Sequence, residues 1–339
     1  MELYVMTKDF VIVGVVEEFK SLIWAKRYWN FGDCEVYIKA SEKVLDLLKV
    51  GNIITRKDDD MVCIIEYVEI KTSAEDGDYV VVKGSDARCL LDRRIVWGLM
   101  DYVGSVEGLI RTIVDDNVVN PPMAERRIQN TALGEVAGLD DSIEVQISYA
   151  NVGEKVRGLC ETYLYGSRMI LDNGVLRFGL YEGSALDLIF ATEFDNLIKT
   201  DYIEDYRTVS NVALVGGEGE GSSRRTASVG TASGLERREL FVDARSISSD
   251  SEGLGDYDEA LRNEGLEELS KHSVLIRFDG DVDTTGYVYK YKRDYNVGDV
   301  VTIRNGYGQS FRARITEAVE GWDDNGYNVS LTLVYTEGA

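Results

Sequence analysis

The chain has 339 residues, 60 of them acidic and 37 basic, which gives a formal net charge of −23 at pH 7. Hydrophobic residues make up 44% of the sequence, which is a globular composition, and the length predicts two to four domains. The acidity argues against tight nucleic-acid binding, which needs clustered Lys and Arg, and no apolar run approaches the roughly 18 residues of a membrane span.

Short strands dominate the prediction for the first hundred residues. Apolar runs predict strands at 3–19, as a hairpin about Lys8-Asp9, and at 35–38, 61–71 and 79–83. A short capped helix is expected over residues 85–91. Such short strands, separated by turn signals, favour a small barrel or sandwich.

A change of period marks the next segment of the chain. Ser105 predicts the start of a helix whose apolar residues repeat every three or four positions as far as Val114, and Pro121-Pro122 close the segment. A strand at 143–147, an amphipathic helix over 156–164 and a hairpin about Asp172-Asn173-Gly174 follow. We interpret this region as an α+β module inserted into the first set of strands.

Residues 208–247 form a glycine-rich stretch that looks like a phosphate-binding loop. The glycines at 217, 219 and 221 are separated by two glutamates, whose carboxylates would repel a phosphate, and no Gly-Lys-Ser/Thr follows. We therefore interpret them as turn glycines. The stretch predicts a meander of three strands at 209–215, 224–229 and 239–242, with a mobile loop over 216–234.

One helix and a second set of strands are predicted for the last hundred residues. Asp256 can cap a helix that runs through Leu269, with His272 at its end. Strict alternation over 327–333 predicts a strand with one buried face, preceded by a strand at 315–319 and a turn at 323–326. These strands predict a second small barrel.

Few residues could serve catalysis or metal binding. His272 is the only histidine, which excludes a multi-histidine zinc site and leaves one candidate histidine base. Asp279, Asp281 and Asp283 resemble the start of a calcium loop, but the sixth position is Thr instead of Gly and the twelfth is Lys instead of Glu. We therefore predict no tight calcium site and expect these acids on the solvent face of a strand.

The remaining acids and the cysteines also favour structural roles. Asp58-Asp59-Asp60 and Asp323-Asp324 lie beside turn signals, and we expect solvated loop charges there. The four cysteines lack Cys-x-x-Cys spacing, so we expect reduced core residues at Cys34, Cys63, Cys89 and Cys160. The N-terminal segment has no basic region, so we expect no signal peptide and synthesis in the cytoplasm. No catalytic residue, metal or cofactor is predicted.

Three pairs of arginines stand out in this acidic chain. They are Arg93 and Arg94, Arg224 and Arg225, and Arg237 and Arg238. Each pair could be an ordinary surface feature, or its guanidinium groups could reach carboxylates of a neighbouring subunit. We treat these six residues as candidates for a subunit interface.

Four segments of the sequence resemble a known family. They are the glycine-rich stretch, GSDARCLLDRRIVWG (84–98), RNEGLEELSKH (262–272) and the run from Tyr295 to Leu333. Together they resemble siphovirus tail proteins of the Pepy type, which are similar to the baseplate hub proteins of contractile-tailed phages. The resemblance covers most of the chain, and its motifs are structural signatures.

The resemblance implies a mainly β fold with α+β modules: two small β-barrel hub domains plus inserted α/β domains. The implied domains are residues 1–100 with 186–247 for the first hub barrel, 101–185 for an inserted α+β domain, 248–286 for a helix-strand module and 287–339 for the second hub barrel. The chain stops just after the second barrel, so we expect no fibre or peptidoglycan-cleaving extension.

The function that the resemblance implies is that of a structural virion protein of a phage or prophage tail, without enzymatic activity or cofactor. Three copies, each with two barrels, would form the tail-tip or baseplate hub ring, join the sixfold tail tube to the tip and leave a channel for DNA. The implied partners are two further copies in a homotrimer, the distal tail protein, the tail tube and a tip or receptor-binding protein. Assembly would take place in the host cytoplasm, and no membrane insertion is expected.

Two other classes of function remain open from the residues alone. One is a carbohydrate- or cell-wall-degrading hydrolase that uses a pair of Asp or Glu side chains in a cleft. The other is a receptor- or sugar-binding module, for which an exposed aromatic platform drawn from the 20 Tyr and 4 Trp would be the distinguishing feature.

Overall fold

The computed structural model describes residues 1–73, 77–250, 255–282, 289–304 and 306–336. The chain forms two compact units. Unit 1 comprises Met1–Cys89, Gly166–Ile203 and Ile276–Ala339, and unit 2 comprises Leu90–Tyr165 and Glu204–Leu275. Two units are a coarser division than the four predicted domains, whose boundaries stay a prediction. No helix in the described residues is long and apolar enough to cross a membrane.

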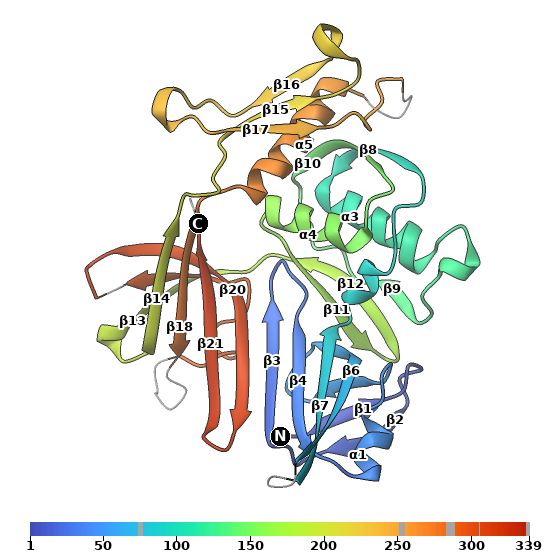
Figure 1. The fold of residues 1–339 in the computed structure, drawn as a ribbon, viewed down its shortest axis with the longest axis vertical. Helices are drawn as coiled ribbons and strands as arrows, with labels where there is room; N and C mark the ends of the chain where they lie inside the picture. Colours follow the sequence, from blue (N-terminus) through green and yellow to red (C-terminus); the bar gives the residue numbers. More distant parts are fainter. Residues whose placement is uncertain (74–76, 251–254, 283–288, 305, 337–339) are drawn as a thin grey trace. The chain divides into compact units, whose positions relative to one another are not determined.

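The N-terminal region of unit 1 is a set of antiparallel strands in the spatial order β2-β1-β5-β6-β7-β4-β3 (Figure 1). Its elements are β1 (Leu3–Met6), β2 (Ile12–Val16), β3 (Ser21–Arg27), β4 (Asp33–Lys39), α1 (Glu42–Leu47), β5 (Ile53–Arg56), β6 (Val62–Ser73) and β7 (Gly77–Asp86). We call these strands the first strand set.

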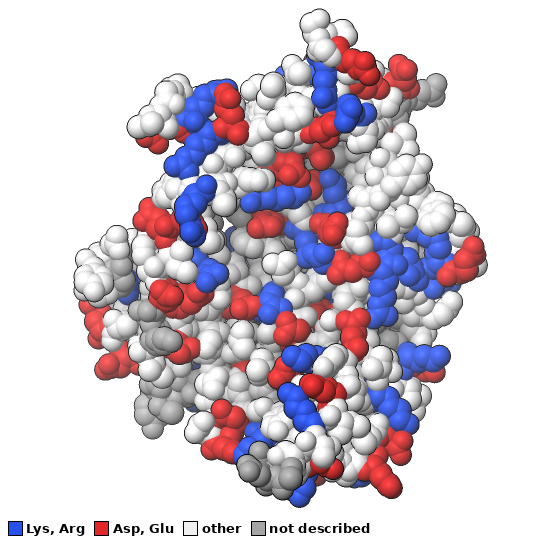
Figure 2. Space-filling model, viewed as in Figure 1, with Lys and Arg blue, Asp and Glu red and all other residues white. Residues whose placement is uncertain are grey.

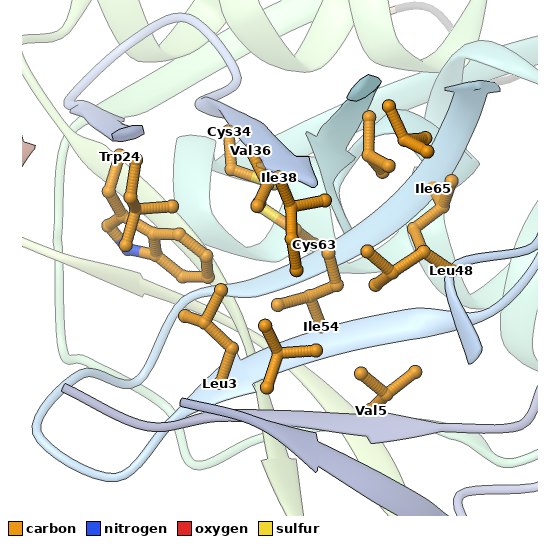
Figure 3. Close-up of a cluster of buried hydrophobic side chains, with 14 of the residues drawn as sticks. Leu3, Val5, Trp24, Cys34, Val36, Ile38, Leu48, Ile54, Cys63 and Ile65 are labelled. Carbon is orange, nitrogen blue, oxygen red and sulfur yellow. The ribbon is translucent and has the colours of Figure 1, made fainter. Parts of the chain in front are cut away.

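Alternate side chains of the first strand set point to one core, as the period of two in a strand requires. Trp24, Val36 and Ile54 are buried there, and Cys34 and Cys63 lie among them (Figure 3). All four cysteines of the chain are buried free thiols. The prediction of reduced core cysteines is therefore confirmed.

A second strand set fills the remainder of unit 1. It consists of β13 (Ala185–Ala191), β14 (Leu197–Asp205), β18 (Leu275–Val282), β19 (Val300–Arg304), β20 (Ser310–Asp323) and β21 (Gly326–Tyr335). Its order is β14-β18-β21-β20, and β19 pairs with both β20 and β13. The largest fully buried side chains of its own core are Tyr28, Tyr295, Phe190 and Phe278.

One long strand joins the two sets into a single sheet of thirteen strands. The first five residues of β20 pair with β19, and Glu317 to Trp322 pair with β3 of the first set. The path of paired strands ends at β2 and at β14. The mainly β architecture is confirmed, whereas closed barrels stay a prediction because no pairing between described strands closes either set.

A hairpin of unit 1 follows its sequence signal closely. β11 (Gly166–Asp172) and β12 (Val175–Tyr181) pair antiparallel around Asn173 and Gly174, both of which have positive φ. A two-residue turn of this kind requires positive φ at both positions, which Asn-Gly tolerates best.

Unit 2 combines helices with two small sheets. Its elements are α2 (Cys89–Asp92, beginning at the last residue of unit 1), β8 (Leu99–Ser105), α3 (Val106–Val114), a π-helical turn (Asp115–Val119), β9 (Thr131–Leu133), β10 (Ser142–Ser148), α4 (Val152–Thr162), β15 (Val212–Gly216), β16 (Thr226–Val229), β17 (Glu239–Asp243) and α5 (Tyr257–Lys271). The predicted caps are confirmed: Ser105 accepts a hydrogen bond from the Gly108 N–H at 3.0 Å, and Asp256 from the Asp258 N–H at 2.9 Å.

The glycine-rich stretch differs from its prediction in two ways. Its strands run in the order β16-β15-β17, with β17 parallel to β15, so the stretch is not a meander. The nine residues between β16 and β17 are long enough to carry the chain back across β15. The predicted mobile loop over 216–234 also contains β16, because Ala227 is buried in the core of this sheet and α5.

Candidate functional site

The single histidine has a structural environment. His272 caps the C-terminal end of α5, and its Nδ1 lies 2.9 Å from the carbonyl oxygen of Glu268. Its own carbonyl accepts a hydrogen bond from the N–H of Ser210 at 2.9 Å. These contacts tie the end of the helix to the segment that leads into β15, and they account for the residue without a catalytic role.

The acids that resemble a calcium loop lie on β18. Asp279 forms an ion pair with Arg277 at 2.8 Å, and Asp281 accepts a hydrogen bond from the Ser330 hydroxyl. Asp283 and Thr284 lie outside the described residues. No group of three or more His, Cys, Asp or Glu side chains is placed to hold a metal ion in the stretches of chain that the structure describes.

The prediction of solvated loop charges after β5 is wrong for Asp59. Its side chain is 0% exposed and lies 2.5 Å from Lys292 Nζ and 3.4 Å from Lys26 Nζ. Burial opposes its ionisation, but the two lysines outweigh burial and lower the pKa of Asp59. The sequence around Asp58-Asp59-Asp60 indicates a turn from local residues alone. It cannot indicate that the ammonium groups of Lys26 and Lys292, which come from distant segments, lie against Asp59.

Asp59 belongs to a buried ionic cluster that links the two strand sets of unit 1. Arg56 at the end of β5 is fully buried and donates to Glu320 of β20 at 3.0 Å. Lys292 bridges Glu320, at 2.7 Å, and Asp59. We call Lys26, Arg56, Asp58, Asp59, Lys292 and Glu320 the junction network.

Aromatic groups enclose the junction network. The guanidinium of Arg56 lies 4.3 Å from the centre of the Trp322 ring and 5.3 Å from that of Trp24. The Tyr327 hydroxyl donates to Glu320 at 2.9 Å, and burial, followed by the charge of Glu320, raises the pKa of Tyr327. Arg56, Asp59 and Glu320 are thus screened from water, whereas the side chain of Asp58 is 54% exposed. Burial makes the ion pairs of these three residues more sensitive to the loss of a partner.

The network coincides with the strand pairing that joins the two sets. In the β3–β20 register, Glu320 lies opposite Trp24 and Trp322 lies opposite Leu22. Hydrogen bonding of the two backbones and pairing of charges therefore act at the same place. The arrangement offers no reacting centre; what it can do is hold two blocks of strands in one fixed relation.

One cavity of unit 1, of about 370 Å³, lies next to the junction and is a place where a hydrolase site could be sought. Four carboxylates line it, those of Asp60, Asp86, Glu182 and Asp299. Asp86 binds Arg88 at 2.7 Å, and Asp299 accepts from the N–H groups of Ser184 and Asn296. Asp60, a further lining residue, pairs with Lys26. Three of these carboxylates are thus engaged with structural partners, and Glu182 alone does not supply the pair that a glycosidase needs.

The arginine pairs that were candidates for an interface have partners within the chain. Arg224 binds Asp243 at 2.5 Å, and Arg225 binds Asp258 at 2.8 Å. Arg237 binds Glu239 at 2.5 Å, and Arg238 donates to the carbonyl of Tyr206. A role at a subunit interface stays a prediction for these four residues and for the pair Arg93 and Arg94.

Arg94 differs from the other paired arginines in the nature of its contacts. Its guanidinium donates to the carbonyl oxygens of Arg126 and Arg93, at 2.7 and 2.9 Å, instead of to a carboxylate. Two large aromatic side chains nearby in the same unit, Trp97 and Tyr149, are 63% and 72% exposed. The sequence contained no signal for this combination.

The sequence matches the family described as "Siphovirus ReqiPepy6 Gp37-like protein" over residues 2–333. A search of curated proteins gives no match. The fold is similar to that of a tail protein from Neisseria meningitidis MC58, with a TM-score of 0.62, 11% identity, and coverage of 98% of this chain and 95% of that one.

Two further solved structures share the fold. The 43 kDa tail protein of prophage MuSo2 from Shewanella oneidensis gives a TM-score of 0.61 at 13% identity, covering 99% of this chain and 98% of that one. The E. coli c3393 protein gives a TM-score of 0.50 at 9% identity, covering 94% of this chain and 74% of that one. It is a type VI secretion component described as structurally similar to the T4 tail proteins gp27 and gp5. At such identities the likeness concerns the fold alone.

Proposed function

Because the chain belongs to the family of Siphovirus ReqiPepy6 Gp37-like proteins, and is thus a structural protein of a phage tail, we propose that it forms the hub ring of a phage or prophage tail tip. Three copies surround the tail channel in this proposal. Each contributes two strand sets, so that six blocks face the sixfold tube and three subunits face the tip.

The observation that carries the proposal is the single continuous sheet of unit 1. The β3–β20 pairing and the junction network hold the two strand sets in one relation, as a subunit with two blocks requires. Among the described strands, β2, β14 and β13 each pair with a single neighbour and so lie at edges of the sheet. Ile12 of β2 is 56% exposed and its neighbours Val11 and Val13 are also exposed, which makes this edge prone to association unless another chain covers it.

The remaining features of the proposal concern partners and charge. The distal tail protein and the tail tube lie on one side of the ring, and a tip or receptor-binding protein lies on the other. A net charge of −23 suits a channel that passes DNA without retaining it. In this proposal the protein acts by geometry and is not an enzyme, which agrees with the structural partners of the cavity carboxylates.

The oligomeric state tests the proposal. Sedimentation velocity and native mass spectrometry of the full chain, together with images of assembled tails, should give a threefold ring at the tail tip. Ile12→Lys on the β2 edge should weaken the ring, whereas the matched control Val50→Lys, at an exposed valine outside any strand, should leave it intact. A protein that is absent from the tail tip, or a closed dimer, would contradict the hub.

A further inference from the structure

Unit 2 carries a group of arginines that are held by neutral oxygen atoms. Arg126 Nη2 lies 2.6 Å from the carbonyl oxygen of Ile95, and the Arg126 carbonyl accepts from Arg94 Nε at 2.7 Å. Arg127 follows directly and is exposed. Burial, followed by the charges of Arg126 and Arg93, lowers the pKa of Arg94. Guanidinium groups are thus crowded together here in a chain whose formal net charge is −23.

This crowding matters because like charges repel most where water is partly excluded. An anion placed among these groups would relieve the repulsion and use donors that already point in fixed directions. Figure 2 shows Lys and Arg side chains gathered over the turns that follow α3, in a surface otherwise mixed in sign. The cluster therefore has the charge of a site for an acidic ligand.

A buried amide fixes the position of the central arginine. Asn117 lies in the π-helical turn, and its Oδ1 accepts from Arg126 Nη2 at 3.0 Å and from the backbone N–H of Trp97 at 3.2 Å. Its Nδ2 donates to the carbonyl of Ile113 at 2.9 Å. The guanidinium of Arg126 also lies 5.0 Å from the centre of the Trp97 ring. Turns of the π type are frequent at functional sites, and this one holds Arg126 ready beside an exposed indole.

Exposed apolar side chains continue from this cluster along β8. Trp97 and Leu99 are exposed, and Val103 is 60% exposed. Tyr149, whose N–H lies 3.4 Å from the Gly98 carbonyl, is exposed and has a φ of 53°, a left-handed conformation that is unfavourable for a tyrosine. Backbone strain at an exposed aromatic residue has no evident benefit for stability, and it fits a surface shaped for contact.

The backbone of β8 has an open edge at this surface. β8 pairs with β10 in a sheet that contains only these two of the described strands. Because the backbone groups of an antiparallel strand alternate between its two edges, every second residue of β8 points its N–H and C=O away from β10. The hydrogen bond from Tyr149 to Gly98 assigns Leu99, Asp101 and Val103 to that outward set, and the carboxylate of Asp101 accepts from Gln146 of β10 at 2.7 Å.

We propose that Arg94, Arg126, Arg127 and Trp97, together with the open edge of β8, form a docking surface for an extended acidic segment of another protein. The segment adds to β8 as a strand, its apolar side chains cover Leu99 and Val103, and its carboxylates meet the arginines. A strand is the occupant that an open edge demands, and carboxylates suit the fork of guanidinium donors.

The length and chemistry of the surface set the form of the segment. Leu99 to Val103 spans about 13 Å along a strand, and the arginine cluster lies at the Trp97 end. A segment of roughly seven residues, acidic at one end and alternately apolar at the other, covers both regions. A sugar would use the aromatic rings without the strand edge. The inference concerns unit 2 alone and holds whatever the position of the protein in the tail.

Peptide binding to the full-length protein tests the proposal. The probe is a labelled peptide of sequence EDEVTVTV, compared with KKKVTVTV, which reverses the charge, and with EDEPTPTP, in which proline removes strand hydrogen bonds. Fluorescence anisotropy should give at least about tenfold tighter binding for the first peptide than for either other. Raising the salt from about 50 to about 300 mM should weaken it.

Variants assign the binding to this surface. Arg126→Gln should weaken EDEVTVTV binding by about tenfold, the loss expected for one charge-assisted contact. Arg127→Gln, at an exposed position, should weaken it without affecting the fold. The matched control Arg262→Gln, at a surface arginine of the same unit that pairs with Glu259, should bind as the wild type does.

Three results would overturn the proposal. They are equal affinity for the three peptides, no binding of EDEVTVTV at about 1 mM, and binding that Arg127→Gln and Arg126→Gln leave unchanged. Binding of polygalacturonate, lost in the same variants, without binding of EDEVTVTV would assign the surface to an acidic polysaccharide instead.

Discussion

Removal of one charge from the junction network should destabilise unit 1 strongly. Glu320 accepts hydrogen bonds from Arg56 at 3.0 Å and from Tyr327 at 2.9 Å, and it forms an ion pair with Lys292 at 2.7 Å. Its side chain is 3% exposed. Glu320→Gln keeps the shape but leaves the fully buried Arg56 with Asp58 as its remaining carboxylate. Breaking a buried pair in this way costs about 3–5 kcal/mol, and we expect a loss near the lower figure because Asp58 stays in place.

The chain allows this loss to be measured in unit 1 alone. Trp24, Trp29 and Trp322 lie in unit 1 and Trp97 in unit 2, so a Trp97→Phe background gives a fluorescence signal from unit 1. With a urea dependence of about 2–3 kcal/mol/M, the unfolding midpoint should fall by about 1–1.5 M.

A second substitution on the same strand serves as the control. Glu317 of β20 also pairs with an arginine, Arg27, but both side chains are 27% exposed. Glu317→Gln should therefore lower the free energy of unfolding by about 1 kcal/mol or less, as for an exposed pair. If Glu320→Gln lost no more than this control, the argument that the network is buried and holds the two strand sets together would be wrong.

Three further outcomes are expected. The pKa of Asp59 is lowered in the fold, so its contribution to stability is present above the unfolded value of about 3.9 and is lost as the pH falls below it. Asp59→Asn should therefore reduce the pH dependence of the urea midpoint between about pH 5 and 2.5. A variant whose midpoint depends on pH as steeply as that of the wild type would refute this. Limited trypsin digestion should cut first at Arg237 or Arg238, in the exposed connection between β16 and β17, and resistance there would count against it. Calorimetry should detect no sub-micromolar calcium site; such a site, abolished by Asp281→Ala, would contradict the expectation.

Local chemistry made several elements of the fold predictable. The caps at Ser105 and Asp256 and the turn at Asn173-Gly174 satisfy backbone groups a few residues away, so a short window of sequence contains all that determines them. The strands at 61–71 and 79–83 correspond to β6 and β7 for the same reason, because the apolar run of each is local.

The junction could not be predicted in the same way. β3 was not recognised, although Leu22 and Trp24 are spaced two apart, and its partner β20 lies about 290 residues further along the chain. The turn signal beside Asp59 predicts a solvated carboxylate because that signal is local, whereas Lys292, which forms the ion pair with it, is distant in the sequence. Pairing between remote segments leaves no periodic pattern in one sequence. The open edge of β8 and the arginines beside it also have no local pattern in the sequence, because Arg94 and Arg126 come together from segments 32 residues apart.

The use of charges at the junction calls for a physical reason, because a buried ion pair is often no more stabilising than apolar side chains of the same volume. Register is the reason that fits this structure. A shift of β3 against β20 by two residues would keep every side chain on its own face of the sheet, so apolar alternation alone does not forbid it. Such a shift would, however, move Glu320 away from Arg56 and Lys292 away from Asp59, and it would leave buried charges without partners.

A fully apolar junction should therefore separate stability from register. The combined variant is Arg56→Met, Asp59→Leu, Lys292→Met and Glu320→Leu. We expect its free energy of unfolding to stay within about 2 kcal/mol of the wild type, or to exceed it, as in other replacements of buried ion pairs. The β3 and β20 amides should nevertheless exchange hydrogen faster, and assembly into the proposed ring should fail, because the two strand sets no longer keep one relation. A variant that is stable, protected from exchange and assembled like the wild type would show that apolar packing and turn geometry set the register without the charges.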